Sequence, residues 1–353
     1  MIERPLIFIP GIFASVLAIG GVPIWPPMTE DAIKKVIDNL STNVRTRIED
    51  KVPVVAIAQV GYDILISAIV GWGYTPDINF WTFPYDWRQS NEISGQLLAR
   101  FIKGKIQGNN NWDSVDIVCH SMGGFVARAA HILGTAPIKR AVYIASPHFG
   151  NPMSYFELNP DIHIIPQGFS VVLDKLPIER ELKDLINGTL EKEWKDLYSK
   201  WPSAYELMPD GFYLENNAMI FSDGKPVLGR NETYLNNDWS LPQDMQDKVS
   251  NAMKFKKTLG EKLPESEDDI LVIFANDLPT IDIINHFSNG VGFTNQFPLD
   301  SGQHGDTWVI TKSAMGSMSG LPVYTKSRPI SDMHPDLPNN GFTIDVIRKF
   351  LNP

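Results

Sequence analysis

The stretch VDIVCHSMGGFVARAA, residues 115–130, joins an apolar run to an alanine-rich run through a short turn that contains Ser121. Residues 115–119 are typical of a buried strand, and residues 125–133 favour a helix. A serine held at a sharp strand-to-helix turn is called a nucleophile elbow, and its usual sequence is G-x-S-x-G. Cys119 stands where the first glycine is expected. Because the close approach of helix and strand requires only a small side chain there, we predict that the elbow forms with cysteine in that place.

Short runs rich in Ile, Val and Phe recur on both sides of this stretch, and helical patterns separate them. This alternation is typical of an α/β fold with a mainly parallel central sheet and helices on both faces. The predicted strands are residues 5–9, 79–83, 115–119, 141–145 and 270–275, with 307–311 and 322–325 as weaker candidates. Further predicted helices are residues 30–40, residues 93–102 with Ser90 as the cap, and residues 344–351.

The alternation fades between residues 151 and 267, where one helical segment, residues 182–200, is followed by stretches rich in glycine, proline and asparagine. An insertion of this length between two strands of a parallel sheet is expected to cover the carboxyl edge of the sheet, where open α/β sheets bind ligands. We therefore predict a core of residues 1–150 and 268–353, and a cap or lid of residues 151–267.

The chain has 353 residues, a net charge of −10 and a single cysteine. Nucleic-acid binding needs a basic surface, so this charge argues against a nucleic-acid partner. One cysteine excludes an intramolecular disulfide, and the first apolar run is too short for a signal peptide. The longest apolar stretch, residues 52–72, is interrupted by Gln59, Asp63 and glycines, which favours a buried helix over a membrane span. We therefore expect a cytoplasmic protein with no integral membrane segment.

Motifs for metals and nucleotides are missing from the sequence. It contains no H-E-x-x-H, no pair of cysteines, and no G-x-G-x-x-G placed between a strand and a helix. The sequence therefore predicts no metal site and no cofactor.

A serine nucleophile also needs donors for the negative oxygen that forms when it attacks a carbonyl group. One donor is the backbone N–H after the serine, which here belongs to Met122. The other is expected in a loop after an early strand, and the segment PLIFIPGIF, residues 5–13, supplies such a loop. Gly11 lets this loop turn toward Ser121, and the N–H of Phe13 is the predicted second donor.

Several short motifs span nearly the whole chain and together resemble one family. They are PLIFIPGIF (5–13), FPYDWR (83–88), CHSMGG (119–124), SPHFGNP (146–152), SAYELMP (203–209), GDTWV (305–309) and His334. In this order the chain resembles the lecithin:cholesterol acyltransferase-like group of α/β-hydrolases. The resemblance implies an α/β-hydrolase fold with a cap and the activity of a serine esterase, lipase or acyltransferase. The chain departs from the group at Cys119, and it lacks the disulfides and the leader of the animal enzymes.

The catalytic residues of this fold follow the order serine, acid, histidine. His334 lies between a late strand and the final helix, where the fold places its base, and it is the prediction among seven histidines. The resemblance implies Asp306, in HGDTWV, as the acid that orients the imidazole. Asp277, directly after the strand 270–275, stays open as the alternative acid.

Other polar residues near the strand ends have expected roles as well. His120 precedes the nucleophile and is expected to point away from the site, whereas His148 follows a strand and is expected to line the pocket. Asp86 and Arg88 are expected to form a buried ion pair that fixes the loop after strand 79–83. The predicted substrate-binding residues are Gly11, Ile12, Trp87 and His148.

These expectations describe an enzyme whose partner is a small-molecule acyl ester. Ser121 attacks the ester, and water resolves the acyl-enzyme in an esterase or lipase, whereas an alcohol acceptor resolves it in an acyltransferase. Thioesters and lactones pass through the same intermediate, so a thioesterase or lactonase stays open. A non-catalytic ligand-binding homologue is the alternative from another class.

Overall fold

The computed structural model describes most of the chain, with gaps concentrated in the predicted cap and near residue 50. The described residues are 2–19, 22–26, 38, 61–108, 112–158, 180–181, 183–184, 196–210, 220–222, 225–226, 243–261, 263–281, 284–286, 304–316, 323–326 and 332–352. The predicted helix at 30–40, apart from Asp38, and most of the helical segment 182–200 therefore lie outside the described residues. No helix in the described part is long and apolar enough to cross a membrane.

The centre of the fold is a six-stranded sheet in which every neighbouring pair of strands is parallel. Strands buried on both faces read as continuous apolar runs, which explains why the sequence predicts them well. Only the weaker candidate at residues 307–311 is wrong, because that segment is a turn leading into a short helix. In spatial order the strands are β13 (Val323–Lys326), β9 (Ile270–Ala275), β6 (Ile138–Ile144), β5 (Val115–His120), β1 (Leu6–Ile9) and β4 (Phe80–Thr82).

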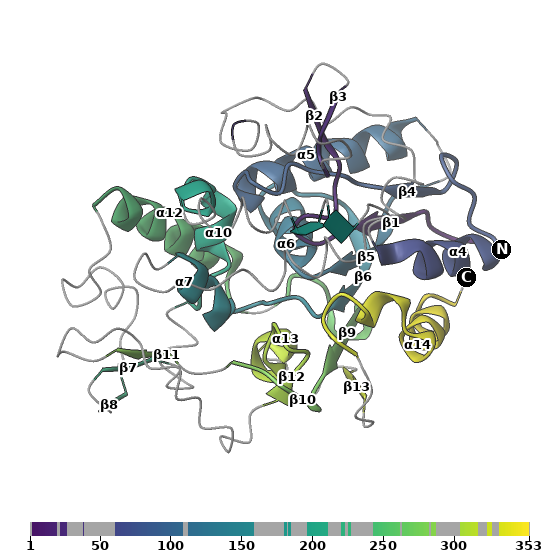
Figure 1. Ribbon diagram of the computed structural model, residues 1–353. Coiled ribbons are helices and arrows are strands. Elements are labelled where there is room, and N and C mark those ends of the chain that lie inside the picture. Colours follow the sequence, from purple (N-terminus) through teal and green to yellow (C-terminus); the bar gives the residue numbers. More distant parts are fainter. Residues whose placement is uncertain are drawn as a thin grey trace.

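Helices flank both faces of the sheet, as predicted. Figure 1 shows α5 (Asn91–Gln107) and α6 (Gly123–Ile132) on one face, and α4 (Asp63–Gly71) with α14 (Gly341–Leu351) on the other. The predicted cap of α5 is confirmed, because the Ser90 side chain accepts a hydrogen bond from the Glu92 N–H. The chain therefore has the mainly parallel α/β architecture that its sequence predicts.

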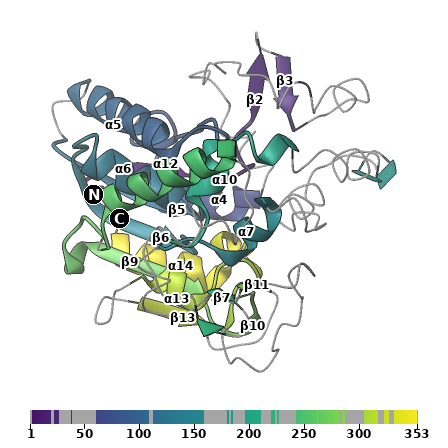
Figure 2. The same cartoon turned by 90° about the vertical axis from the view of Figure 1, so that its left-hand side faces the viewer.

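The segments between β6 and β9 contribute three helices to the described structure. They are α7 (Pro152–Leu158), α10 (Pro202–Glu206) and α12 (Gln243–Leu259), followed by a single 3₁₀ turn (Glu267–Asp269). Helices α10 and α12 lie side by side in both views (Figures 1 and 2). The division into a core and a cap at residues 151 and 267 stays a prediction.

Short strands and turns complete the described fold. The ribbon of β2 (Leu17–Ile19) and β3 (Val22–Trp25) projects away from the central sheet (Figure 2). The remaining elements are β7 (Ile220–Ser222), β8 (Lys225–Pro226), β10 (Leu278–Pro279), β11 (Ile284–His286), β12 (His304–Gly305), α13 (Thr311–Met315) and a 3₁₀ turn (Leu337–Asn339). Strand β7 pairs with β11, so the predicted cap shares a small sheet with the segment that follows β9.

Candidate active site

Ser121 stands at the turn between β5 and α6 in a strained backbone conformation. Its φ is 53°, in the left-handed region that side-chain-bearing residues rarely adopt. A Cβ added to Gly123 would lie 2.6 Å from the Pro10 carbonyl oxygen, and one added to Gly124 would lie 2.3 Å from Ser146 Oγ. Both positions therefore exclude any side chain. The residues after Ser121 form the tight turn that the elbow predicts.

Cys119 occupies the elbow position at which the usual sequence has glycine. It is fully buried, and its Sγ lies 3.3 Å from the Val142 carbonyl oxygen on the neighbouring strand β6. The thiol is therefore accommodated inside the core beside β6. Burial raises the pKa of Cys119 well above its usual range, so the thiol stays neutral.

Ser121, His334 and Asp306 form a buried chain of hydrogen bonds. His334 Nε2 lies 2.7 Å from Ser121 Oγ, and His334 Nδ1 lies 2.7 Å from Asp306 Oδ2. A carboxylate only accepts hydrogen bonds, so Nδ1 carries the proton and Nε2 accepts from the serine hydroxyl. His334 comes from the loop after β13, Asp306 directly follows β12, and Ser121 follows β5.

The loop around Asp306 holds its carboxylate and the imidazole in place. Asp306 Oδ1 accepts hydrogen bonds from the N–H groups of Val309, at 2.7 Å, and Trp308, at 3.0 Å. The His334 N–H donates to the Asp306 carbonyl oxygen at 2.8 Å. This bond, together with the one between the side chains, fixes the relative position of the two residues. The partner of the imidazole is Asp306 and not the alternative acid, Asp277.

The loop after β1 lies close to the serine. A Cβ on Gly11 would lie 3.0 Å from Ser121 Cβ, so glycine allows this approach without crowding the serine. Phe13 has a φ of 64° and its carbonyl oxygen accepts from Trp25 Nε1 at 2.7 Å. Within the described residues the Met122 N–H donates no hydrogen bond to the protein. Because it lies beside the serine, the Met122 N–H can donate a hydrogen bond to a ligand oxygen.

The segment FPYDWR holds the loop after β1 from behind. Tyr85 Oη donates to the Pro10 carbonyl oxygen at 3.1 Å, and Trp87 Nε1 donates to the Ser15 carbonyl oxygen at 3.1 Å. The predicted ion pair is confirmed: Arg88 binds the Asp86 carboxylate through two bonds of 2.9 Å, and both side chains are buried. These contacts of the FPYDWR segment therefore hold the loop after β1 in place.

Of the four predicted substrate-binding residues, Ile12 lines the described cavity at Ser121. Gly11, Trp87 and His148 do not. Trp87 is fully buried behind Phe13, with ring centroids 4.8 Å apart, because its indole supports the loop. Gly11 packs against Ser121 Cβ. His148 packs against Tyr143, and burial with the nearby Arg128 charge holds its pKa well below the usual range. Gly11, Trp87 and His148 lie outside this described lining, and their role as substrate contacts stays a prediction.

His120 does not point away from the site, contrary to the prediction. Its ring lies 4.7 Å from the ring of His334, and its Nε2 is 3.0 Å from the His334 carbonyl oxygen. Its Nδ1 is 2.7 Å from Tyr62 Oη, which in turn accepts from the Gly11 N–H at 3.0 Å. Burial keeps the pKa of Tyr62 above its usual range, so the phenol donates to Nδ1 and His120 Nε2–H donates to His334. One buried network thus joins the loop after β1 to the loop that carries His334.

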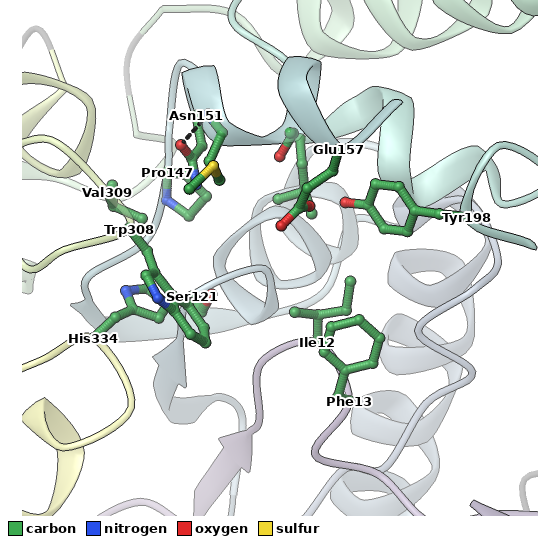
Figure 3. A pocket seen from close by; sticks show the side chains of 13 residues that line it. Ile12, Phe13, Ser121, Pro147, Asn151, Glu157, Tyr198, Trp308, Val309 and His334 are labelled. Atoms are coloured by element: carbon green, nitrogen blue, oxygen red, sulfur yellow. Dashed lines mark hydrogen bonds between the residues drawn. The ribbon is translucent and has the colours of Figure 1, made fainter. Parts of the chain in front are cut away.

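A cavity opens beside Ser121 and His334 and is lined from three sides (Figure 3). Trp308 and Val309 lie on the side of His334, Ile12 and Phe13 come from the loop after β1, and α7 faces them. The lining residues are Ile12, Phe13, Ser121, Pro147, Asn151, Met153, Ser154, Glu157, Tyr198, Leu207, Trp308, Val309 and His334. Most of them are apolar or aromatic, which is typical of a pocket for an organic ligand.

Sequence reasoning missed several residues of this site. Glu157, Tyr198 and Trp308 line the cavity, and Tyr62 joins the network under the base. Trp308 lies inside the GDTWV motif, which could have indicated it, whereas Glu157, Tyr198 and Tyr62 belong to no motif. No group of three or more potential metal ligands occurs in the described part of the chain.

Comparisons with known proteins agree on the fold. Residues 91–162 match the family described as the PGAP1-like alpha/beta domain. A protein of Saccharomyces cerevisiae, the uncharacterized protein YJR098C, is 26% identical over 142 residues, 35% of this chain. The match covers 21% of the yeast protein, so the chain spans about a fifth of that relative's length.

Two solved structures are similar over almost the whole chain. A chain of the Tle4–Tli4 complex aligns with a TM-score of 0.59 and 14% identity, covering 99% of this chain and 98% of that chain. The propeptide form of the Bacillus licheniformis lipase BlEst2 aligns with a TM-score of 0.45 and 12% identity, covering 99% of this chain and 50% of that chain. Together with the parallel sheet and its flanking helices, the family match and the first of these structures show an α/β-hydrolase-like fold.

Proposed function

We propose that this chain is a serine hydrolase of carboxylic esters that works through an acyl-enzyme on Ser121. The observation that carries the proposal is the hydrogen-bonded chain from Ser121 through His334 to Asp306. A serine hydroxyl is a poor nucleophile until a base removes its proton, and an acid beyond the base keeps the imidazole in the required tautomer. A pure ligand carrier needs neither of these two contacts.

In this mechanism Ser121 Oγ attacks the ester carbonyl carbon while His334 Nε2 takes the hydroxyl proton. The carbonyl oxygen becomes negative and accepts hydrogen bonds from the N–H groups of Met122 and Phe13. Collapse of the tetrahedral intermediate releases the alcohol, which receives its proton from His334. Loss of one oxyanion donor lowers kcat about 10²- to 10³-fold in enzymes of this kind. The two N–H groups therefore account for a large part of the proposed rate enhancement.

The acyl-enzyme is then resolved by water, with His334 as the base again. Transfer to an alcohol is the alternative that the lecithin:cholesterol acyltransferase-like motifs suggest. Thioesters and lactones are further candidate substrates. The apolar lining formed by Ile12, Met153, Leu207 and Val309 supports an acyl group or alcohol with hydrocarbon character.

Labelling with a fluorophosphonate tests the proposal directly. We expect one adduct on Ser121 in the wild type and none in Ser121→Ala, measured by intact-mass and peptide mass spectrometry. Folded wild-type protein that acquires no adduct would contradict a catalytic role for Ser121.

Product analysis separates hydrolysis from transfer. p-Nitrophenyl esters of several acyl lengths are incubated with and without added primary alcohols, and both free acid and new ester are quantified. The proposal expects free acid as the main product. New ester formed at the expense of free acid identifies an acyltransferase.

A further inference from the structure

Polar side chains gather on one wall of the cavity, apart from the serine and the histidine. Glu157 and Ser154 belong to α7, and Tyr198 comes from the segment before α10. Figure 3 shows the Glu157 carboxyl and the Tyr198 hydroxyl pointing toward each other across from Ile12 and Phe13. We call Ser154, Glu157 and Tyr198 the polar wall.

The members of the polar wall affect one another's protonation. Burial raises the pKa of Tyr198 well above its usual range, so the phenol keeps its proton. The Tyr198 hydroxyl, which points toward Glu157, lowers the pKa of that carboxyl, and Ser154 lowers the pKa of Tyr198.

Glu157 is a buried acid with an exposed fraction of 9%. Among the described residues that line the cavity there is no lysine or arginine. Burying a carboxyl costs stability, and an apolar residue in this wall would avoid the cost. The nearby Tyr198 hydroxyl favours the charged form, but burial outweighs it and raises the pKa of Glu157 to about 8.

At neutral pH the Glu157 carboxyl is therefore mostly protonated. A neutral carboxyl offers one O–H donor and a carbonyl acceptor at the same time. An alcohol hydroxyl also donates and accepts, so the two groups match without bringing a charge into the cavity. An ammonium group lacks an acceptor, and a carboxylate lacks a donor and adds a second acid.

We propose that Glu157 and Tyr198 bind a hydroxyl group of the substrate, and that the preferred substrates are esters with a free hydroxyl on the part that enters this cavity. The inference rests on the proposed ester hydrolysis at Ser121. The inference adds the chemical class of the substrate to that proposed function. The hydroxyl belongs either to the acyl group, as in a hydroxyacyl ester, or to the alcohol, as in a monoester of a polyol.

Paired substrates test the inference and separate the two sources. One pair is a p-nitrophenyl hydroxyacyl ester and its deoxy counterpart, and the other pair is a glycerol monoester and the propyl ester of the same acid. The measured quantity is the ratio of kcat/KM within each pair. We expect a ratio of about tenfold or more in favour of the hydroxylated ester in at least one pair, because the deoxy ester lacks the hydrogen bonds to Glu157 and Tyr198.

Variants of Glu157 then assign the preference to the polar wall. Glu157→Leu removes both hydrogen-bonding functions and is expected to reduce the ratio to near one. Glu157→Gln keeps a donor and an acceptor and is expected to retain most of the ratio. Tyr198→Phe should lower it partially. Ratios are unaffected by the fraction of folded enzyme, so a less stable variant still gives a valid result.

The outcomes distinguish this inference from the function on which it rests. Wild-type enzyme that is labelled at Ser121 and hydrolyses both members of each pair equally overturns the inference and leaves the ester hydrolase standing. A preference for hydroxylated esters that Glu157→Leu retains also overturns it. Preference for an aminoacyl ester, lost in Glu157→Gln, assigns a cation in place of a hydroxyl. Absence of both labelling and hydrolysis overturns the proposed function and the inference together.

Discussion

Cys119 is the residue at which the elbow departs from its usual sequence, and its surroundings explain why cysteine is accepted. The side chain is fully buried, and its Sγ lies 3.3 Å from the Val142 carbonyl oxygen of β6. We expect Cys119→Gly to cost about 1 kcal/mol of unfolding free energy, since glycine weakens a strand, and to keep kcat within about threefold. Cys119→Leu overpacks the site, with an expected cost of about 1–3 kcal/mol and a large loss of kcat.

Chemical unfolding and ester hydrolysis measure both Cys119 variants. Cys119→Ala serves as the control for removal of the thiol without glycine's backbone freedom. A Cys119→Leu enzyme with normal turnover would show that β5 and its neighbours adapt to a larger side chain.

Asp306 and Asp277 make a paired prediction at the same scale. The Asp306 carboxylate holds the proton on His334 Nδ1, and an amide in its place favours the wrong tautomer. We expect Asp306→Asn to lower kcat about 10⁴-fold, and Asp277→Asn to change kcat less than about threefold. Steady-state hydrolysis of one ester by both variants decides between them. Loss of turnover in Asp277→Asn alone would reverse the assignment.

Among the structural elements, the loop after β1 depends on Tyr62, which no motif indicates. Removing its hydroxyl in Tyr62→Phe removes the hydrogen bonds that it makes with the Gly11 N–H and with His120 Nδ1 in a buried site. We expect a loss of about 1–3 kcal/mol of unfolding free energy and a fall in kcat of about tenfold, with KM little changed. The fall in kcat reflects displacement of the predicted oxyanion loop and of the base.

Tyr74→Phe is the matched control for this variant. Tyr74 is also buried, but it lies beside Asp116 at the start of β5, whereas Ser121 follows the end of that strand. Tyr74→Phe removes a hydroxyl distant from Ser121 and should leave turnover unchanged. Equal effects of both substitutions on kcat would argue against a positioning role for Tyr62.

The contact between α10 and α5 gives a prediction about stability. Glu206 of α10 accepts hydrogen bonds from Ser90 Oγ at 2.6 Å, the Asn91 N–H at 2.8 Å and Asn91 Nδ2 at 2.7 Å, at the first turn of α5. In Glu206→Gln an amide NH₂ replaces one of the acceptor oxygens and faces these donors. We therefore expect the unfolding free energy, measured with urea, to fall by about 1–3 kcal/mol. Glu92→Gln, an exposed acid in the same turn, is the control and should change little. Equal stability of the two variants would contradict this description of the contact.

For the whole molecule, the buried Glu157 predicts how stability depends on pH. Its pKa is raised to about 8 by burial, whereas a glutamate in an unfolded chain titrates near 4.3. Between these values the folded state holds a proton that the unfolded state has released, so the unfolding free energy falls as pH rises through this window and levels off above about 8. Urea unfolding at pH 5, 6.5 and 8 measures the slope. Glu157→Gln should reduce it, and an unchanged slope in this variant would contradict the raised pKa.

The sequence predicts the central sheet well for a physical reason. Each of its strands is an apolar run buried between helices, so the pattern is local and strong, as in β5 and β9. The segment at 307–311 misled because Val309 and Ile310 are buried in a turn, and burial alone does not distinguish a strand from a packed loop.

Sequence alone determined the α/β architecture, the elbow at Ser121 and the order in which Ser121, Asp306 and His334 occur, because each depends on residues close together in the chain or on a motif. Only the tertiary structure decided which acid contacts His334, that His120 and Tyr62 join the network beneath it, and that Glu157 faces the cavity. Those contacts join segments tens to hundreds of residues apart. Their partners are chosen by packing and burial in the folded chain, and no local pattern of side chains records that choice.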